Sequence, residues 1–338
     1  MSLQPLSAPR ILIVKLSSLG DVVHAMAAVQ DIRRALPEAQ IDWVVERAFA
    51  PLVARCEGVQ RVIACDIRRW RKSIFSSKTR REWRAFTTEL QAQPYDAVID
   101  LQGLTKSALV SWLTRIKVGG LRYGLANRTD GSSFEAPARW VADRAIRLEP
   151  HVHAVQRSRL LCAQALGYAV QGEPVFGLRG GALAARPEKG KAAKPVVALV
   201  HGTSRADKEW PLQSWIEIGR RLNQAGFRVG LPHGGGAEKA VSEQIAAALD
   251  DAWVWPSMAL DALTDTLAQC AGVIGVDSGL SHIAVALDLP HVQIYNFDTA
   301  WRTGVNNARQ VCLFAQPTPD ADSVWQAWSA VHTAAARP

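Results

Sequence analysis

The sequence predicts an α/β protein with two doubly wound parallel sheets, each in its own domain. Three observations lead to this prediction. The chain has 338 residues, 48% hydrophobic and 21% charged, and at about 150 residues per domain this length suits two domains that each bury a core. Short apolar runs alternate with helix-like segments in both halves of the chain. Residues 171–194, rich in Gly, Pro, Ala and charge, interrupt that alternation.

The first domain, residues 1–170, is expected to contain strands that are buried on both faces, because its apolar runs are continuous and rich in β-branched residues. We expect these strands at residues 11–15, 41–45, 61–65 and 97–101. Apolar residues at helical spacing, with charges on the other side, predict helices at 21–36 and 80–91. Strand and helix in alternation indicate a parallel sheet with right-handed crossovers.

The second domain, residues 195–338, follows the region 171–194, which we interpret as the linker. Strands are predicted at residues 196–201, 228–231, 253–255, 273–276 and 292–295. Helices are predicted at 212–225 and 237–249 and from Leu260, Leu280 and Ser323, the last one packing back on the first domain. In such sheets ligands bind outside the carboxyl ends of the strands, so two facing units would define a cleft.

Charge and cysteine content narrow the class of partner. The formal net charge of +8 favours an anionic partner: a phosphorylated small molecule, a membrane surface or a nucleic acid. Five scattered cysteines without a C-x-x-C pair argue for a reducing compartment and against a disulfide framework or a zinc site.

No targeting or membrane-spanning segment is expected. The apolar stretch 11–14 lies between Arg10 and Lys15 and is too short for a signal peptide. No run of about 18 apolar residues occurs. We therefore expect a cytoplasmic protein, one face of which can still rest on a bilayer.

The first candidate site is the loop 15–21 (KLSSLGD), between the first strand and the first helix. Gly20 would permit a tight turn, and the free N–H groups of the following helix attract anions. The loop matches neither G-x-G-x-x-G nor Walker A. Asp21 is open to two interpretations, a cap of the helix or a general base at the mouth of a cleft.

The second candidate site is the segment 201–211 (HGTSRADKEWP). Thr203 and Ser204 follow a strand and Lys208 comes shortly after, an arrangement suited to phosphate oxygens. The alternative is a polar turn before a helix that begins near Pro211.

The third candidate site is the segment 275–282 (GVDSGLSH), which ends a buried strand and opens a helix. Its free N–H groups would point toward a ligand, and it is not the G-x-S-x-G elbow. His282 alone would be read as a structural imidazole, but beside Ser278 and Gly279 a contact with a donor ligand is favoured.

Two charged segments have competing interpretations. The run from Arg68 to Arg84 is either a solvated face or, with Trp70 and Trp83 among its arginines, a site for a polyanion or nucleic acid. The Asp320-x-Asp322 pair looks like a D-x-D metal motif, but its place before a helix favours capping over metal binding.

Taken together, these motifs resemble those of glycosyltransferase family 9, the ADP-heptose:lipopolysaccharide heptosyltransferases. The matching stretches are ILIVKLSSLGDVVH (11–24), IRRWRK (67–72), YDAVIDLQGLTKSA (95–108), HGTSRADKEWP (201–211) and VDSGLSHIAVALDLP (276–290). The resemblance implies a GT-B fold, two Rossmann-like domains with the acceptor on the first and the nucleotide sugar on the second, and inverting chemistry without a metal or other cofactor. It departs at 295–299, where YNFDT replaces a Gly-Pro-Thr-Asp-like loop.

The resemblance also implies roles for individual residues. Asp21 matches the catalytic base, and Lys208 would stabilise the departing diphosphate. Donor contacts are implied for Thr203, Ser204, Lys208, Glu238, Met258, Asp277, Ser278, Gly279 and His282. We assign acceptor contacts to Ser18, Gly20, Arg68, Arg69, Arg71, Lys72 and Gln102.

The function expected from this resemblance is transfer of L-glycero-D-manno-heptose from ADP-heptose to Kdo of Kdo-lipid A. The enzyme would be a monomer, peripheral at the cytoplasmic face of the anionic inner membrane of a Gram-negative cell, with no nucleic acid as partner. Alternatives are heptosyltransferase II or another family-9 sugar transferase, and a non-catalytic nucleotide-sugar-binding protein. A nucleic-acid-binding protein is disfavoured because the cationic cluster is short and accompanies two sugar-nucleotide-type domains.

Overall fold

The computed structural model describes residues 8–181 and 194–335. The chain divides into two compact units, Met1–Arg179 and Gly180–Pro338, and each is described by itself. The boundary falls inside the segment interpreted as the linker. Before it, Phe176 and Leu178 are buried, and Leu178 forms an isolated bridge with Cys56 of the first unit. Residues 182–193 of that segment lie outside the described residues.

The first unit contains a six-stranded sheet in the order β3-β2-β1-β4-β5-β6, with every neighbouring pair parallel. Its strands are β1 (Arg10–Val14), β2 (Gln40–Glu46), β3 (Val59–Cys65), β4 (Tyr95–Asp100), β5 (Ile116–Leu125) and β6 (Arg144–Ile146). Its helices are α1 (Leu19–Ala35), α2 (Ala50–Val53), α3 (Ile67–Trp70), α4 (Ser77–Leu90), α5 (Thr105–Leu113), α6 (Ala136–Val141) and α7 (Ala154–Leu166), with a 3-10 turn η1 (Arg47–Phe49).

The second unit repeats this topology, with a six-stranded parallel sheet in the order β12-β11-β10-β7-β8-β9. Its strands are β7 (Val196–Val200), β8 (Arg228–Leu231), β9 (Ala252–Val254), β10 (Gly272–Val276), β11 (His291–Tyr295) and β12 (Gln310–Phe314). Its helices are α8 (Leu212–Gln224), α9 (Gly236–Ala247), α10 (Leu260–Ala268), α11 (Gly279–Ala286), α12 (Ala300–Thr303) and α13 (Ala321–Ala335), with a 3-10 turn η2 (Ala206–Lys208). Two doubly wound parallel sheets are thus confirmed.

Strand order reverses once in each sheet, between β1 and β4 and between β7 and β10. Successive connections leave these central strands in opposite directions, so their carboxyl ends border a crevice that backbone does not fill. The first unit places the β1–α1 and β4–α5 loops there, and the second places the loops after β7 and β10.

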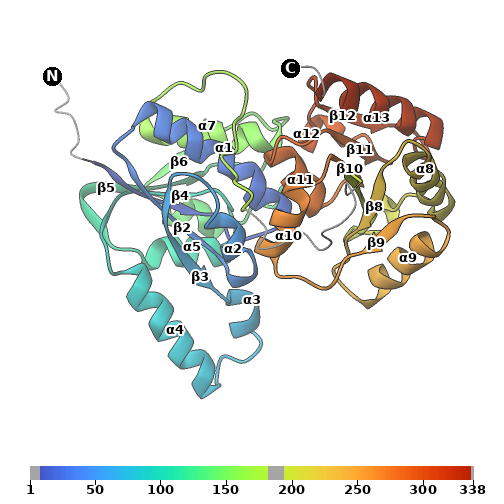
Figure 1. The fold of residues 1–338 in the computed structure, drawn as a ribbon. Helices are drawn as coiled ribbons and strands as arrows, with labels where there is room; N and C mark the ends of the chain where they lie inside the picture. The colour runs from blue at the N-terminus through green and yellow to red at the C-terminus, as the bar shows by residue number, and fades with distance from the viewer. Residues whose placement is uncertain (1–7, 182–193, 336–338) are drawn as a thin grey trace. The chain divides into compact units, whose positions relative to one another are not determined.

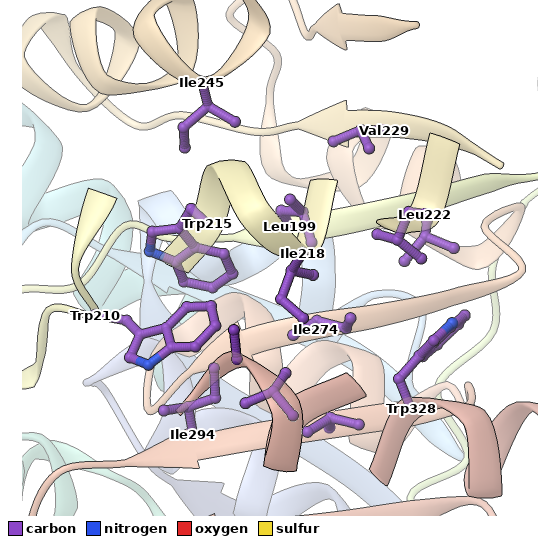
Figure 2. Packing of buried hydrophobic residues seen from close by; sticks show 14 of the residues in the cluster. Leu199, Trp210, Trp215, Ile218, Leu222, Val229, Ile245, Ile274, Ile294 and Trp328 are labelled. Atoms are coloured by element: carbon purple, nitrogen blue, oxygen red, sulfur yellow. The ribbon is translucent and has the colours of Figure 1, made fainter. Parts of the chain in front are cut away.

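The core of each sheet is built from the apolar runs that the sequence shows. In the first unit, α1 and α7 pack side by side (Figure 1), and the middle of α1 is buried. In the second unit, Trp210 and Trp215 pack edge to face at 4.9 Å, and Leu199, Ile274 and Ile294 lie in the same cluster (Figure 2). These buried sheets leave ligand chemistry to the loops at their edges.

The C-terminal helix α13 packs on α8, β11 and β12 of its own unit. Trp328 lies so close to Gly272 of β10 that a Cβ there would meet its ring at 2.6 Å. The expectation that this helix packs on the first domain stays a prediction. No helix in the described parts of the chain combines the length and apolarity needed to cross a membrane.

Several elements in the structure have no counterpart in the sequence prediction. β5 contains Gly119 and Gly120, and its pairing with β4 shifts register there, so its apolar pattern is broken. β12 is a five-residue strand at the sheet edge. Short or irregular strands carry a weak periodic signal.

A buried ion pair joins α1 to α7. Arg159, fully buried, donates from Nε to Asp31 Oδ2 at 2.6 Å and from Nη2 to Oδ1 at 3.1 Å. Nη2 also donates to the carbonyls of Gln171 and Gly172, at 3.0 and 3.1 Å. This arginine therefore fixes the last segment of the first unit as well as the two helices.

Arg159→Ala is expected to lower the free energy of unfolding by about 3 kcal/mol or more, because removing one partner leaves the Asp31 carboxylate buried without its main counter-charge. Lys117→Ala is the matched control, since the Lys117–Asp96 pair is partly exposed and should contribute less than about 1 kcal/mol. Denaturant unfolding measures both. Similar losses in the two variants would contradict the role given to Arg159.

Candidate functional site

In the first unit, the crevice at the strand reversal is organised by Gln102, just after β4. Its Oε1 accepts hydrogen bonds from the backbone N–H groups of Leu16 and Ser17, at 3.1 and 3.0 Å. Lys106 Nζ donates to Ser17 Oγ at 2.8 Å. The β4–α5 loop therefore fixes the conformation of the β1–α1 loop.

Asp21 makes different contacts with its two carboxylate oxygens. Oδ2 accepts hydrogen bonds from the backbone N–H and hydroxyl of Ser18, at 3.1 and 2.8 Å. Oδ1 lies 3.8 Å from Lys15 Nζ and 3.5 Å from Arg157 Nη2. Asp21 thus takes part in the cap of α1, as one interpretation expected, and it also faces two cations that a cap does not need.

The side chains of Asp21, Lys15 and Arg157 are buried to different extents. The side chain of Asp21 is 34% exposed, whereas that of Lys15 is 3% and that of Arg157 is 7% exposed. Burial raises the pKa of Asp21. The charges of Lys15, His24 and Arg157 and the Ser18 hydrogen bond lower it by more, so the pKa lies well below its usual range. Burial lowers the pKa of Lys15, which Asp21 partly offsets. The group offered to solvent is a carboxylate.

Gly20 does not form the tight turn that the sequence suggested. It is the second residue of α1, which begins at Leu19, and it is not among the positive-φ glycines. The helix starts two residues earlier than predicted, because Ser18 and Asp21 bond to each other across its first turn.

The predicted acceptor arginines follow the carboxyl end of β3. The backbone N–H of Arg68 donates to Glu46 Oε1 at 3.2 Å, while its side chain is exposed. Arg69 pairs with Asp66 at 3.1 Å and with Glu82. Among the residues that the structure describes, no ion pair is formed by Arg68, Arg71 or Lys72. Arg69 is therefore occupied within the fold, and the other three have free cationic heads.

In the second unit, Asp277 lies at the carboxyl end of β10 and contacts Lys208 and His282. Lys208 Nζ donates to Asp277 Oδ2 at 2.5 Å, and His282 Nε2 lies 3.2 Å from Oδ1. Burial raises the pKa of Asp277, but His282 and Lys208 lower it well below its usual range. The acid is 7% exposed and Lys208 is 17% exposed, so the group nearer solvent is the ammonium.

The remaining predicted donor residues surround this pair to different degrees. Thr203 Oγ1 donates to the carbonyl of Asp277 at 3.4 Å. Ser278 caps α11 by position, and within the described chain its buried hydroxyl has no hydrogen-bond partner. Gly279 is the first residue of α11. Ser204 is exposed, and no hydrogen bond joins it to the other residues of the site.

A pocket of about 200 Å³ lies beside Thr203. Glu238, in the first turn of α9, accepts a hydrogen bond from the Gly234 N–H at 2.5 Å and packs against Gly202. Met258, half-buried, accepts a weak contact from Thr266 Oγ1 at 3.7 Å. The lining residues are His201, Gly202, Thr203, Glu209, Trp210, Leu212, Trp215, Ala237, Glu238 and Val241. Glu238 thus lies in the pocket, and Met258 is not among the residues that line it.

The loop 295–299, where the sequence departs from the Gly-Pro-Thr-Asp-like pattern, contacts the segment that carries Lys208. Asn296 Nδ2 donates to the carbonyl of Glu209 at 2.8 Å, and its Oδ1 accepts from Thr318 Oγ1 at 2.7 Å. The Arg205 guanidinium lies 5.8 Å from the centroid of the Phe297 ring. This loop therefore holds both ends of the short turn that presents Lys208.

Sequence reasoning missed three residues that shape the two sites. Lys15 begins the loop 15–21 and could have been suspected as a cation next to a buried strand. Arg157 lies in α7, far along the chain, and nothing in its local sequence marks it. His201, buried, hydrogen-bonds Ser242 Oγ through Nε2 at 2.8 Å and positions the strand end before Thr203.

The Asp320-x-Asp322 pair caps a helix, as predicted. Asp320 Oδ1 accepts from the Ser323 N–H at 2.7 Å at the start of α13, and Asp322 pairs with Arg221 at 2.6 Å. Among the described residues, no three His, Cys, Asp or Glu side chains gather as they would around a metal ion.

Comparison with known proteins places this arrangement in a family. The model of the family "Glycosyltransferase family 9 (heptosyltransferase)" matches residues 83–327. A lipopolysaccharide heptosyltransferase 1 of Pseudomonas aeruginosa is 40% identical over 90% of this chain and 83% of its own length. The corresponding protein of Escherichia coli K12 is 37% identical over 90% of this chain and 93% of its own length.

A solved structure agrees with the sequence matches. The structure described as E. coli heptosyltransferase WaaC with ADP superposes with a TM-score of 0.83 at 35% identity, and the match covers 94% of this chain and 98% of that one. The predicted GT-B fold class is thereby confirmed. The motifs, the paired sheets and these relatives agree, and the chain belongs to glycosyltransferase family 9, the heptosyltransferases.

Proposed function

We propose that this glycosyltransferase moves L-glycero-D-manno-heptose from ADP-heptose to a Kdo residue of Kdo-lipid A, with inversion at the anomeric carbon and without a metal. One observation carries the proposal: each sheet has, at its strand reversal, an acid paired with basic side chains, and the more exposed member of the pair differs between the two sheets. The first offers the carboxylate of Asp21, and the second offers the ammonium of Lys208.

The second unit would bind the donor. The Lys208 ammonium neutralises charge on the diphosphate, which increases as the bond to the anomeric carbon breaks. Thr203 and Ser278 can donate hydroxyl hydrogen bonds, and the first N–H groups of α11 point to the same region. Glu238 and the pocket beside it suit the nucleoside. His282 would keep Asp277 ionised and in place while Lys208 turns toward phosphate.

In the first unit, Asp21 would act as the base. The acceptor oxygen attacks the anomeric carbon, the carbon–oxygen bond to ADP breaks on the opposite face, and Asp21 takes the hydroxyl proton. Lys15 and Arg157 keep this carboxylate ionised at neutral pH but also make it a weak base. A weak base suits a reaction with an oxocarbenium-like transition state, because the attacking hydroxyl becomes strongly acidic only as its oxygen bonds to carbon.

The acceptor fits the free cations of the first unit. Kdo carries a carboxylate and lipid A carries phosphates, and Arg68, Arg71 and Lys72 are exposed beyond the same sheet edge as Asp21. Because that acceptor is a lipid, the enzyme would work at the cytoplasmic face of the inner membrane. The proposal includes a monomer, with the acceptor in the first domain and the nucleotide sugar in the second.

Release of ADP from ADP-heptose, measured with and without Kdo-lipid A, tests the function. Release that depends on Kdo-lipid A supports it. Release that requires an already heptosylated acceptor instead would assign the chain to the sister activity, heptosyltransferase II. Binding of ADP-heptose without any transfer would identify a non-catalytic nucleotide-sugar-binding protein.

Asp21→Ala and Asp21→Asn should each reduce kcat by about 100-fold or more, since a positioned general base contributes 10² to 10⁴. The amide of Asp21→Asn can still accept hydrogen bonds from Ser18, so it preserves the cap but removes the base. ADP-heptose affinity should change little in both. Steady-state kinetics and calorimetry provide the two readouts, and near-normal turnover in Asp21→Asn would leave Asp21 with the capping role alone.

Lys208→Ala should weaken ADP binding by about tenfold or more, because a charge-assisted hydrogen bond contributes roughly 1.5–3 kcal/mol, and it should slow transfer as well. Lys239→Ala, which removes an exposed lysine paired with Glu243 on α9, is the control and should bind ADP normally. EDTA should leave the wild type active. Calorimetry that shows unchanged ADP affinity in Lys208→Ala, or activity lost to EDTA, would overturn the donor assignment or the metal-free mechanism respectively.

Neutralising Arg68 and Arg71 together, as Arg68→Gln/Arg71→Gln, should raise the acceptor KM about tenfold or more and leave the affinity for ADP-heptose unchanged. Arg139→Gln/Arg144→Gln removes two exposed arginines of the same unit, and Arg144 begins β6 at the opposite edge of the sheet. This control should keep a normal KM. Loss of donor affinity with a normal acceptor KM would contradict the division of labour between the domains.

A further inference from the structure

The loop that joins α3 to α4 in the first unit, residues 71–76, carries an exposed apolar pair. Ile74 is 56% and Phe75 is 86% exposed, and every residue of this loop is exposed. Figure 1 shows the loop at the free end of α4. Apolar side chains this open to water gain free energy from a contact that covers them. The mechanism proposed above gives this pair no task.

The loop stands on a packed aromatic base. Trp70 lies 5.6 Å from both Trp83 and Phe86, measured between ring centroids, and Trp83 lies 5.8 Å from Phe86. Trp70 Nε1 also donates to Glu82 Oε2 at 2.8 Å. The start of the loop is therefore anchored to the side of α4.

Hydrogen bonds fix the turn itself. The hydroxyls of Ser73 and Thr79 are 3.0 Å apart, and Arg80 Nη2 donates to the carbonyl of Phe75 at 3.2 Å. The Ser76 N–H donates to the carbonyl of Ser73 at 3.0 Å. With both base and turn bonded, the outward position of Ile74 and Phe75 belongs to the folded loop.

Positive charge surrounds the apolar pair. Residues 67–84 contain eight Arg or Lys residues and a single acid, Glu82, which Arg69 binds. The exposed cations are Arg68, Arg69, Arg71, Lys72, Lys78, Arg80, Arg81 and Arg84. Apolar side chains within a cationic surround match the surface of an anionic bilayer, where acyl chains lie beneath charged headgroups. A nucleic acid would leave Ile74 unused, since an aliphatic side chain offers no ring for a base to stack on.

The loop also lies beyond the carboxyl ends of the strands, the same side of the sheet on which Asp21 lies. α3 follows the carboxyl end of β3, where the Arg68 N–H donates to Glu46 Oε1 at 3.2 Å. The Glu46 N–H in turn donates to the carbonyl of Leu16, at the end of β1, at 3.1 Å. A bilayer that met the loop would therefore present its headgroups toward the edge where Asp21 is offered.

We infer that the α3–α4 loop docks the first unit onto an anionic lipid bilayer, with Ile74 and Phe75 entering the interface below the headgroups and the surrounding cations contacting headgroup phosphates. The inference rests on the proposed function only in that a lipid acceptor brings the enzyme to a membrane. The contact itself requires no acceptor, so it can be measured separately.

The test is co-sedimentation of the full chain with vesicles of phosphatidylcholine containing phosphatidylglycerol, at low and at high salt. Ile74→Ser/Phe75→Ser should bind about tenfold more weakly and lose the part of binding that survives high salt. Lys78→Gln/Arg81→Gln should bind about tenfold more weakly at low salt and keep the salt-resistant part. Phe314→Ser, at a 42% exposed phenylalanine of the second unit, should bind as the wild type does.

The inference fails if Ile74→Ser/Phe75→Ser binds these vesicles as the wild type does, or if pure phosphatidylcholine vesicles bind equally well. It also fails if the apolar pair proves to join two copies of the chain, seen as a dimer that the double variant dissociates in sedimentation. Transfer of heptose to a deacylated, water-soluble Kdo acceptor is measured in parallel and should be normal in both double variants, Ile74→Ser/Phe75→Ser and Lys78→Gln/Arg81→Gln. Absent transfer in a wild type that binds vesicles would overturn the proposed function alone.

Discussion

The reversal of strand order at the centre of each sheet is the constraint on which the sites depend. A parallel sheet whose connections turn away from each other at one point leaves a crevice between two strand ends. The strands that border it must be buried on both faces, which the apolar sequences of β1 and β10 satisfy. Polar residues can then be concentrated in the loops without cost to the core, and both units use the same solution.

The two crevices carry related charge clusters with opposite orientation. Asp21 is more exposed than its partners Lys15 and Arg157, whereas Asp277 is less exposed than its partner Lys208. A buried charge needs a partner nearby, and in both clusters the basic neighbours hold the pKa of the acid well below its usual range. In the proposed mechanism this difference matters, because the exposed carboxylate would accept a proton and the exposed ammonium would neutralise phosphate, and a transferase with an anionic leaving group needs both.

Regular periodic segments made most of the fold predictable, and local sequence made only part of the site predictable. Strands such as β8, at Arg228–Leu231, occur at the predicted residues, because a buried strand needs a continuous apolar run. β5 was missed because glycines interrupt its pattern. In the sites, Asp21 and Lys208 belong to recognisable loops, but Arg157 reaches Asp21 only through the packing of α7 on α1. The helical conformation of Gly20 depends on a side-chain bond between Ser18 and Asp21, which composition alone does not reveal.

The loop after β11 departs from the Gly-Pro-Thr-Asp-like pattern that the resemblance implied, and its contacts give that departure a practical meaning. Asn296 bonds at once to a carbonyl of the Lys208 segment and to the hydroxyl of Thr318. Phe297 lies beneath the Arg205 guanidinium. These side chains form one interlocked set drawn from three separate stretches of chain. A chimera that carries a Gly-Pro-Thr-Asp-like loop would therefore also need matching residues at positions 205 and 318. Replacing the loop alone would leave Arg205 and Thr318 without their present contacts.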